Sequence, residues 1–444
     1  MFKKFCLFLF CILILTGCSN PTVKKSAELA IYDNMVNRSL LFEGNTSRIK
    51  EKLHKAKKGE KVVIAYLGGS ITNGAEVADG KGYAPISFNK IKDFIGKKAN
   101  LEYINAAYDG TSSILGNTIA DKEVLSKKAD IIFIEYAVND RPEQIYRAAF
   151  ESLIRTCLNN KNNPAVILIL TCTDKGVSRQ DFMTQIGKYY NLPVIAVANA
   201  VQPEISAARM KPDEYFQDIA HPTEYGHRLM ADFIMNYIKK AYKTKSKDVY
   251  VVPSKMYPKS TFENVKFISA KNIHADNDGS FIRKETKNKL FPEAVEYLTN
   301  TGNKPFEFTI TANNIFLVAP KCLSEVSNAD IYINSQKTMT INLARNGKID
   351  DIIQAFLIYS SDKTEPVKVS IKIPEEENIN FAEPENNAEP QKSDENSISE
   401  SNFPEEEKVT IVTKKNKTVK NTIPFTFYGI GYTKNTDGQN NRGK

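Results

Sequence analysis

The chain has 444 residues and a formal net charge of +8, and 41% of its residues are hydrophobic and 25% charged. A domain commonly holds ~100–200 residues, so the length predicts two or three domains, and the composition excludes a wholly disordered or fibrous chain. A pI of 8.8, without zinc-finger, RNP or helix-turn-helix spacing, gives no support for nucleic-acid binding. With four histidines, any neutral-pH base or imidazole ligand must be His54, His221, His227 or His274.

The N-terminus has the pattern of a secretory signal. Two lysines precede a wholly apolar run at residues 5–15, which is too short to cross a ~30 Å hydrocarbon core as a helix. The run ends in LTGC at residues 15–18, which resembles the lipobox of bacterial lipoproteins. That resemblance implies diacylation of Cys18 and an extracytoplasmic protein anchored by lipid on a cell membrane or outer membrane. The alternative is a small-residue cleavage site that precedes an ordinary cysteine.

Between residues 62 and 242, short β-branched apolar runs alternate with amphipathic stretches. The runs lack two-residue alternation, as is typical of parallel strands buried on both faces between helices. We therefore predict a three-layer α/β domain with a five-stranded parallel sheet, closed by a helix with apolar residues at helical spacing from Leu229 to Ile238. The predicted strands are residues 62–67, 101–106, 131–135, 165–170 and 193–197.

After about residue 250 the pattern changes to two-residue alternation. Phe306, Phe308 and Ile310 alternate with polar residues, and residues 367–373 do the same. These are the marks of half-exposed antiparallel strands, and they predict a β-sandwich-like second domain. We expect this domain to resume with strands at 409–412 and 423–432.

An acidic segment interrupts the second domain. Residues 374–407 hold twelve acidic residues and one lysine, so they cannot bury enough apolar surface to offset their ordering entropy, and we predict a disordered insertion. A calcium-binding role is disfavoured because the carboxylates lack an EF-hand register. The whole predicted organisation is a signal peptide (1–17), a tether with N-terminal helices (18–60), the α/β domain (61–243), the β-rich domain (250–373), the insertion (374–407), the remaining strands (408–435) and a flexible tail (436–444).

The six cysteines do not suggest a disulfide framework. Two lie within the signal and Cys18 is the predicted anchor, which leaves Cys157, Cys172 and Cys322. An odd remainder without CxxC spacing indicates neither a disulfide set nor a zinc site. We predict buried free thiols, with a bridge between Cys157 and Cys172 as the alternative in an oxidising compartment.

The first predicted strand of the α/β domain runs into a glycine-rich turn, GGSITNG at residues 68–74. A serine on such a turn, at the carboxyl end of a central strand, has an exposed hydroxyl above a helix N-terminus, which suits a nucleophile. Ser70 is therefore a candidate nucleophile, and a helix cap or a phosphate-binding turn is the alternative. Nucleotide binding is disfavoured because the turn lacks a Walker lysine and a GxGxxG pattern.

A second candidate element is DIAHP at residues 218–222, just before the last predicted helix. A nucleophilic serine needs a base, and the base needs a partner that fixes its tautomer. Asp218 and His221 can supply both from one tight turn, because Pro222 disfavours helical backbone at His221. A structural Asp–His hydrogen bond that caps the helix is the alternative. The other histidines are expected to take no part in chemistry, one being structural and two at the surface: His227, His54 and His274.

Two further turns could provide an oxyanion hole. Gly110 follows the second predicted strand and can expose its backbone N–H, and Asn139 follows the third and can offer its side-chain amide. In an open parallel sheet the ligand crevice lies along the carboxyl ends of the strands, so these turns should converge with Ser70 and His221.

Together these segments resemble the conserved blocks of the SGNH (GDSL-like) hydrolases, in particular the branch whose first block reads GGSIT. The resemblance covers about 180 residues, with all four blocks in the family's order. It implies a flavodoxin-like fold in which Ser70 is the nucleophile and Asp218 and His221 complete the triad. It also implies an oxyanion hole made by the N–H groups of Ser70 and Gly110 and by the amide of Asn139.

Two departures from that branch concern the acyl pocket. Tyr108 and Asp109 stand where the branch often has small residues before the block-two glycine. The tryptophan that the branch often places after block one is at best represented by Tyr83. The departures bear on the shape and charge of the pocket rather than on the catalytic set.

The resemblance implies ester hydrolysis through an acyl-enzyme, without a metal or an organic cofactor. An anchored enzyme with a β-rich companion domain further suggests deacylation of an extracellular glycan, with O-acetyl as the favoured acyl group. We therefore expect an acylated small molecule or glycan as substrate, the membrane as a partner through Cys18, and no nucleic acid. Two alternatives stay open: an O-acyltransferase of the same family, and a non-catalytic glycan-binding surface lipoprotein.

Overall fold

The computed structural model describes residues 21–245, 249–257, 261–299, 301–345, 352–374 and 423–435. The predicted signal peptide with Cys18, the acidic insertion from residue 375, the strand expected at 409–412 and the tail at 436–444 lie outside these residues. Within the described ranges, no helix is both long and apolar enough to cross a membrane.

The N-terminal half of the described chain is built on a mostly parallel sheet with the strand order β1-β6-β5-β4-β2-β3. Its strands are β1 (Leu40–Phe42), β2 (Lys61–Gly68), β3 (Asn100–Ala107), β4 (Ile131–Glu135), β5 (Ala165–Leu170) and β6 (Val194–Ala196). The five parallel strands match the five predicted ones closely. The sheet has one strand more than predicted, because β1 pairs antiparallel with β6 at the edge. At the other edge β3 is largely exposed over its first half, which a strand with a single neighbour tolerates.

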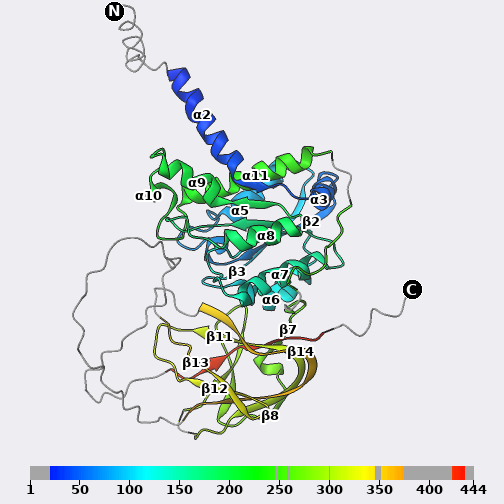
Figure 1. The fold of residues 1–444 in the computed structure, drawn as a ribbon, viewed down its shortest axis with the longest axis vertical. Coiled ribbons are helices and arrows are strands. Elements are labelled where there is room, and N and C mark those ends of the chain that lie inside the picture. Colours follow the sequence, from blue (N-terminus) through cyan, green and yellow to red (C-terminus); the bar gives the residue numbers. More distant parts are fainter. Residues whose placement is uncertain are drawn as a thin grey trace, which may run out of the picture.

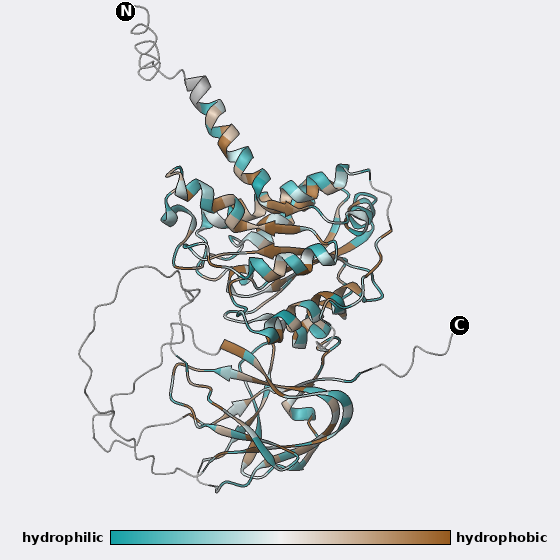
Figure 2. Ribbon diagram, in the orientation of Figure 1, coloured by the Kyte–Doolittle hydropathy of each residue, from teal (hydrophilic) through white to brown (hydrophobic). Residues whose placement is uncertain are grey.

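Helices cover both faces of this sheet (Figure 1). They are α2 (Pro21–Arg38), α3 (Ser47–Lys57), α4 (Ser70–Asn73), α5 (Tyr83–Ile95), α6 (Ser113–Ala120), the π-helical turn η1 (Asp121–Leu125), α7 (Gln144–Leu158), α8 (Gln180–Tyr189), α9 (Val197–Ser206), α10 (Pro212–Tyr215) and α11 (Glu224–Lys243). Along β2, Val63 and Leu67 pack with α6, α7 and α8, whereas Ile64 and Tyr66 pack with α3, α5, α9 and α11. Both faces of the central strands β2, β4 and β5 are therefore apolar, and Figure 2 shows a brown layer between the helices.

The C-terminal half is a separate antiparallel β domain. Its elements are β7 (Lys266–Ser269), the 3₁₀ turn η2 (Ala270–Asn272), β8 (Ala275–Asn277), β9 (Phe281–Glu285), β10 (Glu293–Tyr297), β11 (Phe306–Lys321), β12 (Ala329–Ile333), β13 (Gln336–Ile341), β14 (Ile352–Lys372), β15 (Thr426–Phe427) and β16 (Gly429–Thr433). One sheet has the order β15-β10-β9, and the other has β13-β12-β14-β11-β16-β7 with β8 added to β11. The alternating segments of the sequence fall in β11 and β14, which pair with Phe306 opposite Ile371.

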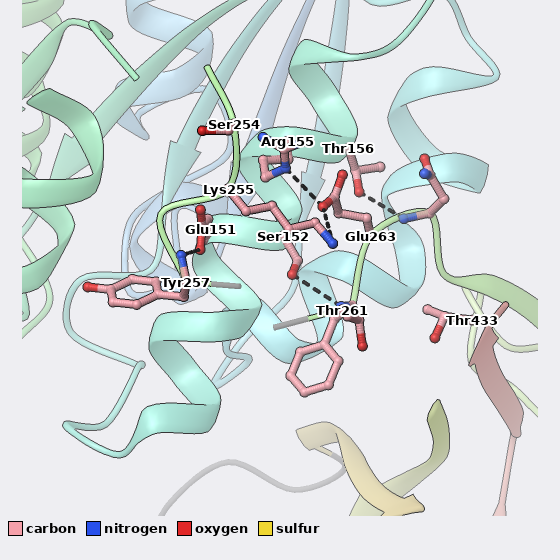
Figure 3. Close-up of polar contacts among 12 residues, drawn as sticks. Glu151, Ser152, Arg155, Thr156, Ser254, Lys255, Tyr257, Thr261, Glu263 and Thr433 are labelled. Carbon is pink, nitrogen blue, oxygen red and sulfur yellow. Dashed lines mark hydrogen bonds and ion pairs between the residues drawn. The ribbon is translucent and has the colours of Figure 1, made fainter. Parts of the chain in front are cut away.

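A stripe of polar side chains on α7 holds the segment that joins the two domains (Figure 3). The buried carboxylate of Glu151 accepts the backbone N–H groups of Met256 at 2.5 Å and Tyr257 at 3.0 Å. One and five residues further along the helix, Ser152 and Thr156 accept backbone N–H groups of Phe262 and Asn264, at 3.2 and 2.9 Å. The described part of this segment is thus bound to α7 at four backbone positions.

Apolar packing continues across the domain boundary. The cluster that contains α6 and α7 also contains buried side chains of the β domain, namely Leu290, Phe291, Ala294, Val318, Ile353 and Tyr428. Tyr108 packs against this cluster and is half-buried. Because a shared apolar cluster resists separation, the two domains are expected to move as one unit.

The cysteines within the described residues are free thiols. Cys157, Cys172 and Cys322 are all buried, so the prediction is confirmed and the bridge between Cys157 and Cys172 is not formed. Burial raises the pKa of the Cys157 thiol and of the Cys172 thiol to about 12. Both are therefore protonated and poorly nucleophilic at neutral pH.

Candidate active site

The site begins at the turn between β2 and α4, where glycine is required by space. A Cβ on Gly68 would lie 2.2 Å from Thr72 Oγ1, and a Cβ on Gly69 would lie 2.7 Å from Asn139 Oδ1. No side chain fits at these distances, so the chain can turn sharply from strand to helix only with glycine in both places. The turn places Ser70 at the first position of α4, at the carboxyl end of a central strand.

The structure brings the three predicted catalytic side chains into one hydrogen-bonded chain. His221 Nε2 lies 2.8 Å from Ser70 Oγ, and His221 Nδ1 lies 2.7 Å from Asp218 Oδ2. A carboxylate only accepts hydrogen bonds, so Nδ1 carries the proton of the neutral ring and Nε2 presents its lone pair to the Ser70 hydroxyl. This is the geometry that a serine nucleophile and its base require.

Local hydrogen bonds hold Asp218 as a carboxylate. Its Oδ1 accepts the backbone N–H groups of Ala220 at 2.8 Å and His221 at 2.7 Å, so both oxygens of the carboxylate are engaged. Burial opposes ionisation, but these backbone bonds and the His221 imidazole outweigh it and leave the pKa of Asp218 below its ordinary value. A bond from Gln217 N–H to the carbonyl of His221, at 2.8 Å, closes the turn.

The two predicted oxyanion turns converge on the same place. Gly110 has φ +65°, a left-handed conformation that suits glycine, and Asn139 lies against Gly69. Asn73 Nδ2 donates to Asp109 Oδ1 at 2.8 Å, which ties α4 to the turn that carries Gly110. In the part of the chain that the structure describes, the N–H groups of Ser70 and Gly110 donate to no backbone carbonyl.

Gly110 also marks the contact between the site and the β domain. A Cβ at this position would lie 2.4 Å from Ile352 Cδ1 and 2.9 Å from its Cγ2. Ile352 is the first residue of β14, so a side chain of the second domain sits directly on this turn.

The remaining histidines lie where they were expected. His54 and His274 are exposed. His227 is fully buried in α11, and its Nδ1 accepts the Tyr83 N–H at 3.1 Å. Burial, with a smaller effect of the nearby His221, lowers the pKa of His227 to about 4, so its ring is neutral at neutral pH.

Both aromatic departures pack against apolar clusters of the α/β domain. Tyr83 is fully buried beneath α4, and its hydroxyl lies 2.8 Å from Thr72 Oγ1. Tyr108 faces the cluster between the domains. The ring of Tyr83 therefore belongs to the core and does not reach the surface around Ser70.

One polar residue of the site carried no function in the sequence analysis. Glu135 ends β4, is fully buried, and accepts the hydroxyl groups of Thr171 at 2.6 Å and Thr72 at 2.9 Å. A carboxylate that ends an otherwise wholly apolar strand was the available signal. Within the described residues, no group of three or more His, Cys, Asp or Glu side chains is placed to hold a metal ion.

Comparison with known proteins shows the fold of the chain. No family model and no curated protein matches it. The solved structure of a two-domain esterase (CEX) active on acetylated mannans is similar over 90% of this chain and 99% of its own, with a TM-score of 0.74 and 21% identity. A second structure with that description, co-crystallized with mannopentaose, gives 0.73 over 90% and 98%.

A lipase/acylhydrolase from Enterococcus faecalis aligns with 42% of this chain and 99% of its own, at 23% identity and a TM-score of 0.33, which is too low to support an argument. The similarity to the two-domain structures carries more weight, because it covers most of both chains at TM-scores of 0.73 and 0.74. At 21% identity this likeness establishes a shared two-domain fold, and what the site does has to be argued from its own residues.

Proposed function

We propose that this chain is a serine esterase that removes short acyl groups, with O-acetyl favoured, from a carbohydrate. The observation that carries the proposal is the continuous chain from Ser70 Oγ through His221 to Asp218, with contacts of 2.8 and 2.7 Å. We assign the oxyanion hole to the N–H groups of Ser70 and Gly110 and the amide of Asn139, and the contacts of Asn73 with Asp109 and of Asn139 with Gly69 support this assignment.

In the proposed reaction, Ser70 Oγ attacks the acyl carbonyl carbon while its proton passes to His221 Nε2. The negative charge that develops on the carbonyl oxygen is stabilised by the three donors. The bond to the alcohol then breaks, and the Nε2 proton goes to the departing oxygen. Water attacks the acyl-serine and gives one proton to His221, which returns it to Ser70 Oγ as the carboxylic acid leaves. Asp218 stays ionised throughout and stabilises the imidazolium.

The choice of substrate has its support in the two-domain similarity. The solved two-domain structures are described as an esterase active on acetylated mannans, and this chain is similar to them over both domains. An acetylated glycan is therefore the substrate class to test first. Fold similarity alone does not fix the sugar, so the sugar has to be found by experiment.

The test uses the chain from residue 19 onward, with 4-nitrophenyl acetate and acetylated glycans as substrates. Wild type should release acetate, whereas Ser70→Ala and His221→Ala should lose about 10³-fold or more in kcat. His54→Ala is the matched control, because His54 is exposed and its Nδ1 contacts only the Lys50 carbonyl at 2.7 Å. Equal inactivity of wild type and both active-site variants, together with glycan binding, would instead favour the binding lipoprotein.

The O-acyltransferase alternative uses the same acyl-enzyme. It is distinguished by the fate of a labelled acetyl group when water and an unacetylated glycan compete for it. Recovery of the label as free acetate supports the esterase, and recovery on the glycan supports the transferase.

We further propose that the enzyme is held on a membrane through lipidated Cys18. The support is the signal and the LTGC sequence at residues 15–18. In a bacterial host, the full chain should partition into the detergent phase and the Cys18→Ser chain should not. Equal partitioning of the two chains would count against the anchor.

A further inference from the structure

Beneath the triad, four donor groups from three segments of the chain face the carboxylate of Glu135. Thr171 Oγ1 donates to its Oε1 at 2.6 Å and Thr72 Oγ1 to its Oε2 at 2.9 Å. The backbone N–H groups of Gly69 and Ala137 lie against the same carboxylate and act to lower its pKa. Glu135 is fully buried, and none of the ion pairs formed within the described residues involves it, so donors rather than a cation hold it.

The donors are arranged for an acceptor that has no proton of its own. A backbone N–H can only donate, which fixes the role of Gly69 and Ala137. Thr72 Oγ1 gives its proton to Glu135 and accepts from the Tyr83 hydroxyl at 2.8 Å, so it cannot reverse without breaking a second bond. Burial raises the pKa of Glu135, and the two threonine hydroxyl groups and the two backbone N–H groups oppose that rise. The Glu135 carboxylate can accept from all of these donors at once. A glutamine amide at the same place would direct its own N–H groups at some of them.

These contacts join the segments that carry the reacting groups. Gly69 directly precedes Ser70, and Thr72 lies two residues after it in α4. Ala137 lies two residues before Asn139, and Thr171 directly follows β5. One side chain therefore connects the nucleophile turn, the Asn139 turn and the neighbouring strand end.

We propose that Glu135 is a positioning residue for this site, and that its carboxylate sets the place of the Ser70 hydroxyl and of the oxyanion donors relative to each other. The proposal rests on the esterase function proposed above. A displacement of about 1 Å in such a site can lower turnover ~10²-fold, because donors must meet the developing oxyanion at hydrogen-bond distance. Glu135 touches no substrate in this proposal and acts through Ser70 and Asn139.

The decisive variant is Glu135→Gln, which keeps the shape and places an NH₂ group against donors. We expect kcat for 4-nitrophenyl acetate to fall about 10- to 100-fold with KM within about twofold. The rate at which diethyl 4-nitrophenyl phosphate inactivates Ser70 should fall by the same factor, since it needs the same hydroxyl and the same oxyanion donors.

The matched control is Glu151→Gln, which also alters a fully buried carboxylate that accepts two backbone N–H groups, but on α7 and away from Ser70. It should lower the unfolding midpoint in urea without changing kcat or the inactivation rate. If Glu135→Gln behaves like this control, Glu135 is structural and the inference is wrong, while the esterase proposal stands.

Other outcomes are also decisive. If Glu135→Gln does not fold, Thr171→Val replaces it, since it removes one donor to the carboxylate and leaves the Ser70 turn untouched. This milder change should lower kcat and the inactivation rate together by about three- to tenfold, and unchanged rates would overturn the inference. If wild type neither hydrolyses esters nor reacts with the phosphate ester, the esterase proposal fails and this inference fails with it.

Discussion

The contact between Gly110 and Ile352 allows a direct test of how the β domain bears on the site. In the variant Gly110→Ala, the new methyl group would lie 2.4 Å from Ile352 Cδ1, 2.9 Å from Cγ2 and 3.0 Å from Cγ1. Ile352 is only 7% exposed, so it has little room to move away. The substitution therefore combines a steric conflict between the domains with a backbone conformation, φ +65°, that disfavours any side chain.

The two contributions can be separated. A left-handed conformation costs a residue with a Cβ about 1–2 kcal/mol. Overpacking of a well-filled contact costs about 1–3 kcal/mol more. Gly80→Ala measures the first contribution by itself, because Gly80 has φ +79° and nothing lies within 4 Å of its added Cβ. We therefore expect Gly110→Ala to destabilise the protein by about 2–5 kcal/mol, against about 1–2 kcal/mol for Gly80→Ala.

The double variant isolates the contact. Ile352→Ala alone should cost about 2–5 kcal/mol, as for other buried isoleucines. In that background the conflict with Ile352 is gone, so Gly110→Ala should cost only the left-handed conformation. The destabilisation of the double variant should therefore be about 1–3 kcal/mol smaller than the sum of the two single variants. Turnover should follow the same pattern, since removal or displacement of an oxyanion donor lowers kcat ~10²–10³-fold and relief of the conflict restores part of the loss.

The assay is urea unfolding of the chain from residue 19, followed by circular dichroism because the protein has no tryptophan. The hydrolysis of 4-nitrophenyl acetate is measured on the same samples. Additive costs in the double variant, with Gly110→Ala equally harmful in both backgrounds, would refute the contact between Ile352 and the site.

Two further predictions concern buried carboxylates. Burial raises the pKa of Asp140 from 3.8 to about 7, so the folded protein binds this proton more tightly than the unfolded chain. The contribution of this proton to the free energy of unfolding is fully present below about pH 4 and is lost as the pH rises through 7. At ~1.4 kcal/mol per pKa unit, the loss is at most about 4 kcal/mol. Asp140→Asn should therefore show a smaller fall of the melting temperature between pH 5 and 7.5 than wild type, and parallel curves would exclude the shift. Glu151→Ala leaves the N–H groups of Met256 and Tyr257 without their acceptor, at about 1–3 kcal/mol for each buried donor, and leaves the Tyr190 hydroxyl only its longer contact of 3.3 Å with the Ser254 carbonyl. It should lower the free energy of unfolding by about 3 kcal/mol or more, and a loss below about 1 kcal/mol in urea unfolding would show that the linker is not held as described.

The predictable parts of this protein are those specified by residues close together in the chain. Strands β2, β4, β5 and β6 are mainly continuous apolar runs, and β3 keeps enough apolar residues around Glu102 and Asn105 to be placed in the same way. The turn at residues 218–222 is also local, because Asp218 bonds the backbone three residues later and Pro222 excludes a helix. Strand β1 has three residues and no periodicity, and its place depends on a bond from Ala196 N–H to the Ser39 carbonyl, which no local pattern predicts.

The parts that could not be predicted depend on pairs far apart in the chain. Tyr83 stands near the nucleophile turn in sequence, yet its environment is decided by His227 in α11 and by Thr72. The proposed role of Glu135 depends on its contacts with Thr171 and Gly69, which follow two other strands of the sheet. Local pattern therefore identified the residues of the proposed triad, whereas the residues that hold them became visible only with the tertiary contacts.

This difference bears on what the β domain does for the proposed reaction. The turn that carries Gly110 is fixed on one side by the Asn73–Asp109 hydrogen bond and covered on the other by Ile352. The first contact belongs to the α/β domain alone, so an isolated α/β domain would keep the triad and half of the support of this oxyanion turn. It would also expose the apolar cluster that Leu290, Phe291 and Val318 now complete. A chain that ends at residue 245 is therefore a poor test of catalysis, and the role of the β domain is better measured in the full chain by the coupling between Gly110 and Ile352.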